Sequence, residues 1–212
     1  EFPNELHSIF SNEYSKHFIL FDTFSKCYIV NMNEETPKID ITIDILLDCK
    51  NICKSYYLND SLVFQKDHIL YFYQDMKISH NIKDVISYSV DSKNGILIII
   101  TLSGLINKLS ISKPQEITIV ETLPFDISQI KIFNIEYMND TLLLIKEDLT
   151  NENNFDLITM SIDKSNKLIF KIQKDLFTLD TMFIDKDQIA KQKEFKFLLC
   201  EEREVIFVYS NI

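Results

Sequence analysis

The sequence predicts an all-β chain made of about five repeated units of about four strands each. One observation is a pattern that recurs five times: an apolar run, a short polar turn and a second apolar run. Another is the composition of these runs, which are rich in Ile, Val, Phe, Tyr and Thr, residues that suit a pleated, half-buried surface. Because 46% of the 212 residues are apolar and 12% are aromatic, the chain has enough apolar material for a substantial core.

Each copy of the pattern predicts a β-hairpin. The five copies cover residues 16–32, 60–76, 94–111, 140–162 and 194–211. Lys66-Asp67, Ser103-Gly104 and the segment 150–154 supply residues that tolerate tight or left-handed turns. We therefore expect short loops in most of the hairpins and a longer loop in the fourth.

Further extended segments flank the hairpins and raise the number of strands to about four per unit. They are the segments 39–45, 54–58, 116–121, 130–137 and 167–172. The hairpins begin at intervals of 34 to 54 residues, which bracket the roughly 40 to 50 residues of one propeller blade. The spacing predicts a β-propeller or a partial propeller in a single domain, residues 1–212.

Two hairpins are preceded by the same Asn-Asp turn, in the segments 58–62 and 138–142. Each segment also matches the Asn-x-Ser/Thr acceptor of N-glycosylation. Because the chain shows no secretory leader, the turn interpretation is favoured.

On its four-strand periodicity the chain resembles degenerate WD40-like propellers of scaffolds such as nucleoporins, vesicle coats and RNA-processing complexes. The resemblance covers nearly the whole chain. The Gly-His and Trp-Asp dipeptides of typical WD40 blades are absent, and the sequence has no Trp. The resemblance implies a protein-protein interaction scaffold that works as a subunit of a larger intracellular complex, cytoplasmic or nuclear.

The ends of the chain predict an incomplete ring. The last unit stops at Ile212 after its third strand, and few residues precede the first unit to supply a fourth. Since the chain begins at Glu1 without an initiator Met, we expect a fragment of a longer protein. An open propeller leaves a strand edge unpaired, so we expect that a partner subunit or further sequence completes the sheet.

The charge narrows the range of partners. A net charge of −10 and a pI near 4.9 repel nucleic acid and anionic lipid, so no direct nucleic acid partner is expected. The longest apolar run, residues 95–101, is far below the roughly 20 residues of a membrane span. The four cysteines, Cys27, Cys49, Cys53 and Cys200, are expected to be free thiols in a reducing compartment.

The residue types that carry chemistry do not form a recognisable motif, so we predict no catalytic, cofactor-binding or metal-binding residues. Cys49 and Cys53 lack a second Cys pair or a zinc-finger His spacing. Gly95 and Gly104 cannot form a phosphate loop. The four histidines, His7, His17, His68 and His80, have no Ser or Cys partner at a known spacing.

An alternative is a five-bladed glycoside hydrolase-like enzyme with carboxylates around a central channel. Most acidic residues lie in expected turns, where solvated charge is typical: Glu34, Glu35, Asp67, Glu147, Asp148, Glu152, Glu201 and Glu202. The lack of Trp and the presence of only two Gly argue against a sugar site.

Three further interpretations concern single segments or the architecture. The aromatic clusters 56–57 and 71–73 are expected to pack inside the sheets. The polar segment 185–193 is expected to be a solvated linker, although insertions between blades can also carry contacts. A two-sheet β-sandwich or a single large sheet with the same hairpins is an alternative fold.

The sequence therefore favours a non-catalytic protein-protein interaction module over the enzyme. Its expected partners are other protein subunits, which it would bind through apolar and aromatic anchors.

Overall fold

The computed structural model describes residues 4–12, 17–32, 36–58, 60–138, 141–148, 154–162, 168–178, 195–200 and 205–210. The chain divides into two compact units. One comprises residues 1–85, 90–97 and 109–117, and the other residues 86–89, 98–108 and 118–212. The single domain that the sequence predicts stays a prediction.

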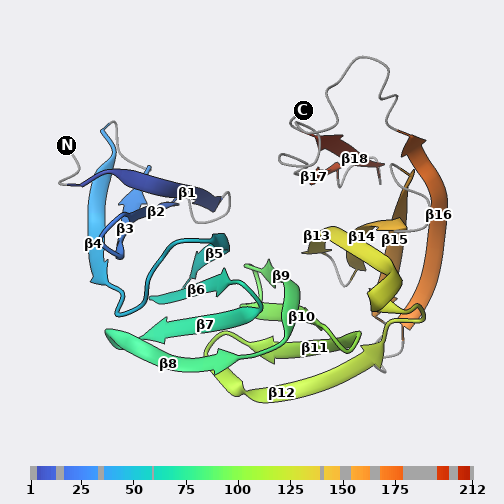
Figure 1. Ribbon diagram of the computed structural model, residues 1–212, viewed down its shortest axis with the longest axis horizontal. Coiled ribbons are helices and arrows are strands. Elements are labelled where there is room, and N and C mark those ends of the chain that lie inside the picture. The colour runs from blue at the N-terminus through green and yellow to red at the C-terminus, as the bar shows by residue number, and fades with distance from the viewer. Residues whose placement is uncertain are drawn as a thin grey trace. The chain divides into compact units, whose positions relative to one another are not determined.

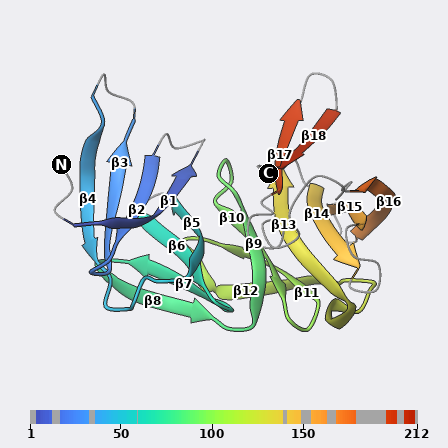
Figure 2. The ribbon, with the colours of Figure 1, turned by 45° about the horizontal axis from the view of Figure 1, so that its top comes forward.

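The first two sheets have four strands each. The first contains β1 (Leu6–Asn12), β2 (His17–Asp22), β3 (Lys26–Asn31) and β4 (Lys38–Asp44), and the second contains β5 (Ile52–Leu58), β6 (Ser61–Lys66), β7 (Ile69–Gln74) and β8 (Lys77–Ile82). Within each sheet the strands lie side by side in the order of the sequence and run antiparallel (Figures 1 and 2). Each sheet is therefore an up-and-down meander.

The remaining strands continue this arrangement. The third sheet contains β9 (Val85–Asp91), β10 (Ile96–Thr101), β11 (Leu105–Ser110) and β12 (Lys113–Thr122), and the fourth contains β13 (Ile130–Met138), β14 (Thr141–Asp148), β15 (Asn154–Ile162) and β16 (Leu168–Thr178). A short 3-10 helix, Ile127–Gln129, precedes β13. The described residues near the C-terminus form a pair, β17 (Phe195–Cys200) and β18 (Val205–Ser210).

The predicted all-β class and all five predicted hairpins are confirmed. The hairpins are β2/β3, β6/β7, β10/β11, β14/β15 and β17/β18. The expected turn residues Asp60, Asp67 and Gly104 have left-handed φ angles of 58°, 54° and 79°. Such angles favour Gly, Asn and Asp. The second Asn-Asp turn, at 139–140, lies outside the described residues.

The sequence missed three strands: β1, β8 and β9. The segment before the first hairpin forms β1, which pairs antiparallel with β2 from Leu6 to Asn12. The first sheet therefore has four strands, and β1 is the first of them (Figure 2).

Burial differs systematically between the strands of a sheet. In β2, β3, β6 and β10 nearly every residue is buried or half-buried, so both faces of these strands are covered. By contrast, the last strands of the sheets are less covered: β4 and β12 are mostly exposed, and β8 alternates between exposed and half-buried residues. A strand that is buried on both faces has a continuous apolar run in its sequence. The hairpins were therefore the clearest signal in the sequence.

The core of the first unit joins the first two sheets. Side chains from both sheets form one buried cluster that includes Ile19, Ile29, Leu62 and Phe64. Phe21 lies edge-on to Phe10 and to Phe64, at centroid distances of 5.9 and 6.1 Å, and Phe64 stacks on Tyr71 at 5.2 Å. Such contacts add specific geometry to the apolar burial, and they fix the two sheets to each other.

A backbone hydrogen bond recurs in the first three sheets. It runs from an N–H just after the fourth strand to a carbonyl in the turn between the second and third strands. The pairs are Ile45 N to Ser25 O (3.0 Å), Val85 N to His68 O (2.9 Å) and Leu123 N to Gly104 O (2.8 Å). All three donors belong to buried aliphatic residues. In each of these three sheets, the chain that leaves the fourth strand is thus anchored to the turn between the second and third strands. This bond is a structural repeat in addition to the repeated strands.

The second unit has an apolar core and a largely buried ion pair. Leu142, Leu144, Ile158 and Met160 are buried on β14 and β15. Lys146 Nζ lies 2.9 Å from a carboxylate oxygen of Asp156, its cross-strand partner. Opposite charges directly across a strand pair favour this register.

Candidate interaction surface

The turn between β2 and β3 is held by a fully buried carboxylate, that of Asp22. One oxygen accepts the backbone N–H groups of Phe24 (2.8 Å) and Lys26 (2.9 Å). The other accepts the Tyr28 hydroxyl (2.9 Å) and the Asn4 amide (2.6 Å). Four hydrogen bonds satisfy both oxygens, which is what a buried carboxylate requires.

The ionisation of Asp22 follows from these contacts. Burial raises the pKa of its carboxyl group, but the hydrogen bonds from Asn4, Lys26, Tyr28 and Phe24 outweigh burial and lower the pKa below its ordinary value. Burial and the bond to Asp22 raise the pKa of Tyr28, so that its hydroxyl remains a donor. The carboxylate is therefore charged at neutral pH and fixes the turn.

The loop after β4 binds to this turn. Ile45 N donates to Ser25 O, and Cys49 N donates to Ser25 Oγ at 3.3 Å. Beside this contact, Phe24 is 72% exposed and Leu46 is 93% exposed, which places them among the most exposed large apolar side chains of the described residues. Two water-facing apolar groups thus stand on adjoining, hydrogen-bonded segments.

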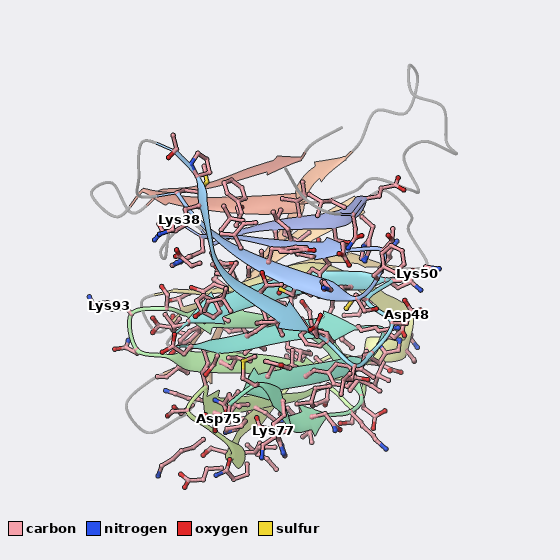
Figure 3. The ribbon with its side chains drawn as sticks, turned by 90° about the vertical axis from the view of Figure 1, so that its left-hand side faces the viewer. Lys38, Asp48, Lys50, Asp75, Lys77 and Lys93 are labelled. Carbon is pink, nitrogen blue, oxygen red and sulfur yellow. The ribbon has the colours of Figure 1, made fainter. Side chains whose placement is uncertain are left out.

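The charges beside these two residues are unevenly exposed. Lys26 lies 3.6 Å from Asp44, and the lysine side chain is 41% exposed against 75% for the aspartate. Lys66 lies 3.8 Å from Asp48, with exposures of 20% and 64%. In both pairs the carboxylate faces water more than the ammonium group does. Lys50 is an exposed cation beside Asp48 (Figure 3).

The Asp48 carboxylate is also fixed. The backbone N–H of Lys50 donates to it at 3.0 Å, and this bond, together with the charges of Lys66, Lys50 and His7, lowers its pKa. We call the group Phe24, Leu46, Asp44 and Asp48 the Phe24 surface.

The other sheets show what the fold itself requires at this turn. The residue before the accepting carbonyl is Phe24 in the first sheet, Asp67 in the second and Ser103 in the third. Asp67 and Ser103 are exposed polar residues, and Leu102 in the third turn is apolar but less exposed than Phe24. The recurring hydrogen bond therefore does not need an aromatic residue at this position.

A second cluster of titratable groups lies between β2, β4 and β5. His17 Nε2 is 3.7 Å from an Asp40 oxygen, and its ring lies edge-on to Tyr57 with centroids 5.5 Å apart. The Tyr57 hydroxyl donates to Asp60 at 2.9 Å. Burial raises the pKa of Tyr57 most, and the hydrogen bond to Asp60 raises it further. Tyr57 is therefore a structural hydrogen-bond donor in this cluster rather than a base.

The thiols are protonated at neutral pH. Cys27 and Cys49 are buried and free, and Cys53 is exposed and free. Burial raises the pKa of the Cys27 and Cys49 thiols, to about 11 for Cys49. A protonated thiol is neither a good nucleophile nor a good metal ligand. The side chain of Cys200 lies outside the described residues.

The other histidines, which are candidates for catalysis or metal binding, make separate contacts. His7 contacts Ser8, at 2.6 Å from Nδ1 to Oγ, and His68 Nδ1 lies 3.2 Å from Val85 O. His80 lies beside Phe72, with ring centroids 6.0 Å apart. Within the described part of the chain, no three His, Cys, Asp or Glu side chains come together in a way that could hold a metal ion.

The carboxylates of the enzyme alternative are mostly outside the described residues, namely Glu34, Glu35, Glu152, Glu201 and Glu202, and so is the segment 185–193. Asp67 lies in an exposed turn, as expected. Glu147 and Asp148 belong to the end of β14. In the aromatic clusters, Tyr57, Phe72 and Tyr73 are buried, in agreement with the expected packing role.

The turn glycines are structural. Gly95 and Gly104 have φ angles of 64° and 79°, a backbone conformation that glycine adopts without a steric penalty. Gly95 directly precedes β10, and Gly104 lies in the turn between β10 and β11. These turn positions explain why glycine occurs at both places.

Among the described residues, no helix has the length and apolar character to cross a membrane. No known family's sequence model matches the chain, and no curated protein matches it. Among solved structures, 524 chains resemble it. One is Hsv2 of Kluyveromyces lactis, a β-propeller, which is 10% identical with a TM-score of 0.50; the match covers 100% of this chain and 87% of that one. At this identity the likeness concerns the fold, and the chain has a propeller-like fold of repeated four-stranded units.

Proposed function

We propose that the chain is a non-catalytic protein-protein interaction module that serves as a scaffold within a larger intracellular complex. The observation that carries this proposal is the Phe24 surface. An exposed aromatic residue stands on a turn that a buried, ionised Asp22 holds rigid, whereas the same position in two other sheets is polar.

Exposed apolar side chains cost little in isolation and are common on protein surfaces. Phe24 differs because its turn is ordered before any partner arrives. A preorganised anchor loses less conformational entropy on binding, and aromatic residues contribute a large share of the binding energy in protein interfaces. This arrangement supports binding rather than catalysis.

The propeller-like fold supports the same function indirectly. Its loops and outer strands are displayed around repeated sheets, which makes the architecture suitable for several partners, but a fold alone does not fix a function. A partner strand that pairs with an open sheet edge remains a second proposed binding mode, since exposed last strands such as β12 end their sheets.

The test is purification of the tagged chain from cells of its source, with quantification of each protein that accompanies it, in the presence and absence of a basic competitor. We expect a partner in a fixed ratio to the chain. The purified chain is also incubated with a panel of glycans. Recovery of the chain without a partner would refute the scaffold, and hydrolysis of a glycan would then support the glycoside hydrolase.

A further inference from the structure

We propose that Phe24 and Leu46 anchor a segment of a protein partner in which an apolar side chain is flanked by lysine or arginine. This inference rests on the proposed function and specifies it, because it names the anchor residues and the chemistry of the partner.

The apolar part of the inference follows from the geometry of the two loops. The backbone bond from Ile45 to Ser25 joins them, so Phe24 and Leu46 each lie one residue from a shared hydrogen bond. Both side chains are mostly exposed. A partner side chain that covers them removes apolar surface from water on both sides, and the gain is about 25 cal/mol per Å².

The fold does not explain the aromatic residue at position 24. Where the same backbone bond recurs, Asp67 and Ser103 stand at the position of Phe24, whereas Ile86 and Pro124, which are also apolar, stand at the position of Leu46. A polar residue is therefore compatible with the turn. The first sheet alone among these three combines two large apolar side chains that are more than two-thirds exposed.

The basic part of the inference follows from the charges. Asp44 and Asp48 are more exposed than Lys26 and Lys66, the lysines with which they pair. In each ion pair the carboxylate is therefore the group that a partner can reach more readily, and Lys50 is a further exposed cation beside Asp48. The net charge of −10 adds a long-range attraction for cationic segments and raises their rate of association.

The test is a selection of phage-displayed random peptides on the intact chain, followed by binding measurements with synthetic copies of the enriched peptides. The test variant is Phe24→Ser/Leu46→Ser, in which the change at position 24 copies Ser103 of the third sheet. The matched control is Met76→Ser, because Met76 is 72% exposed, as Phe24 is, and lies in the β7–β8 turn. Figure 3 shows its neighbours Asp75 and Lys77 away from Asp48 and Lys50.

We expect the enriched peptides to carry an apolar residue between lysines or arginines. The double variant should weaken their binding about tenfold or more, whereas Met76→Ser should leave it unchanged. Circular dichroism and thermal unfolding should be the same for all variants, because the replaced side chains are exposed.

A charge variant separates the two parts of the inference. Asp44→Asn/Asp48→Asn should weaken the basic peptides severalfold and leave unaffected the same peptides with serine in place of lysine and arginine. The loss should shrink as salt concentration rises.

Peptides that bind the double variant as tightly as the original chain would overturn the inference and leave the proposed function in place, because the anchors would then lie elsewhere. Enriched peptides without basic residues, or no enrichment at all, would equally overturn it. The proposed function itself fails only if the purified chain brings no partner.

Discussion

At the scale of single residues, Asp22 contributes most to the Phe24 surface although it is not part of it. Its carboxylate accepts two backbone N–H groups and two side-chain donors, one of which is Asn4, a neighbour distant in sequence. A buried charge is stable only when its hydrogen bonds are complete. The residue therefore connects the order of the turn to the presentation of Phe24.

Replacement of Asp22 by alanine should lower the free energy of unfolding by about 3 kcal/mol. The variant removes the acceptor of the partly buried N–H groups of Phe24 and Lys26 and the Asp22 acceptor of the buried Tyr28 hydroxyl. Chemical denaturation measures the change. Asp48→Ala is the control, because this carboxylate is exposed; an equal loss in both variants would contradict the role of Asp22.

The contribution of Asp22 should also depend on pH. Its pKa is lowered in the folded chain from an ordinary value of 3.8, so the stabilisation is complete above that value and is lost as pH falls through the folded pKa. The stability difference between the original chain and Asp22→Ala should therefore be constant near neutral pH and shrink in acid. Denaturation curves across this range test the sign, and a difference that grows in acid would refute it.

At the scale of elements, the turns determine how each sheet is held. Several turns of the first unit use residues other than glycine in the left-handed region, among them the turn of Asp75 and Met76, whose φ angles are 50° and 61°. Positive φ at both central residues characterises a type I′ hairpin turn, for which Asp-Gly is a preferred pair. The β7–β8 turn therefore has the right shape with an unfavourable second residue.

Met76→Gly should raise the free energy of unfolding by about 1 kcal/mol, because it removes the steric penalty of a left-handed Met. Little packing is lost, since the Met76 side chain is largely exposed. Denaturant titration measures the gain. The control Lys77→Gly, in β8, should lower stability, because glycine weakens a strand; a loss in Met76→Gly would contradict the turn assignment.

How much of the structure could be predicted also differs between elements. The hairpins were visible because β2, β6 and β10 are covered on both faces. The strands β1 and β8 were missed because polar residues such as His7 and Ser79 interrupt their apolar positions, and β8 is half exposed. An alternating pattern of six residues carries little signal beside a continuous apolar run.

The Phe24 surface could not be predicted from sequence. Phe24 follows a buried apolar run, where a phenylalanine reads as part of the core. Its exposure depends on the turn that Asp22 and Ser25 form, and its proximity to Leu46 depends on a bond between residues 25 and 45. The recurrence of that bond at 68 and 85 and at 104 and 123 is a signal that only the folded chain reveals.

At the scale of the whole molecule, repeated four-stranded sheets and an acidic net charge of −10 account for a protein that displays loops without an assembled chemical centre in its described part. Burial raises the pKa of Cys27, Cys49 and Tyr57. Binding to a protein partner is the function that we propose, and the Phe24 surface is the place where we expect it.

The most direct measurement is quantitative co-purification of the tagged chain from cells of its source, carried out in parallel with Phe24→Ser/Leu46→Ser and with Met76→Ser. We expect a protein partner in a fixed ratio to the original chain, retained by Met76→Ser and lost from the double variant. A chain that is recovered alone, with no partner in a comparable amount, would contradict the central claim that it is an interaction module.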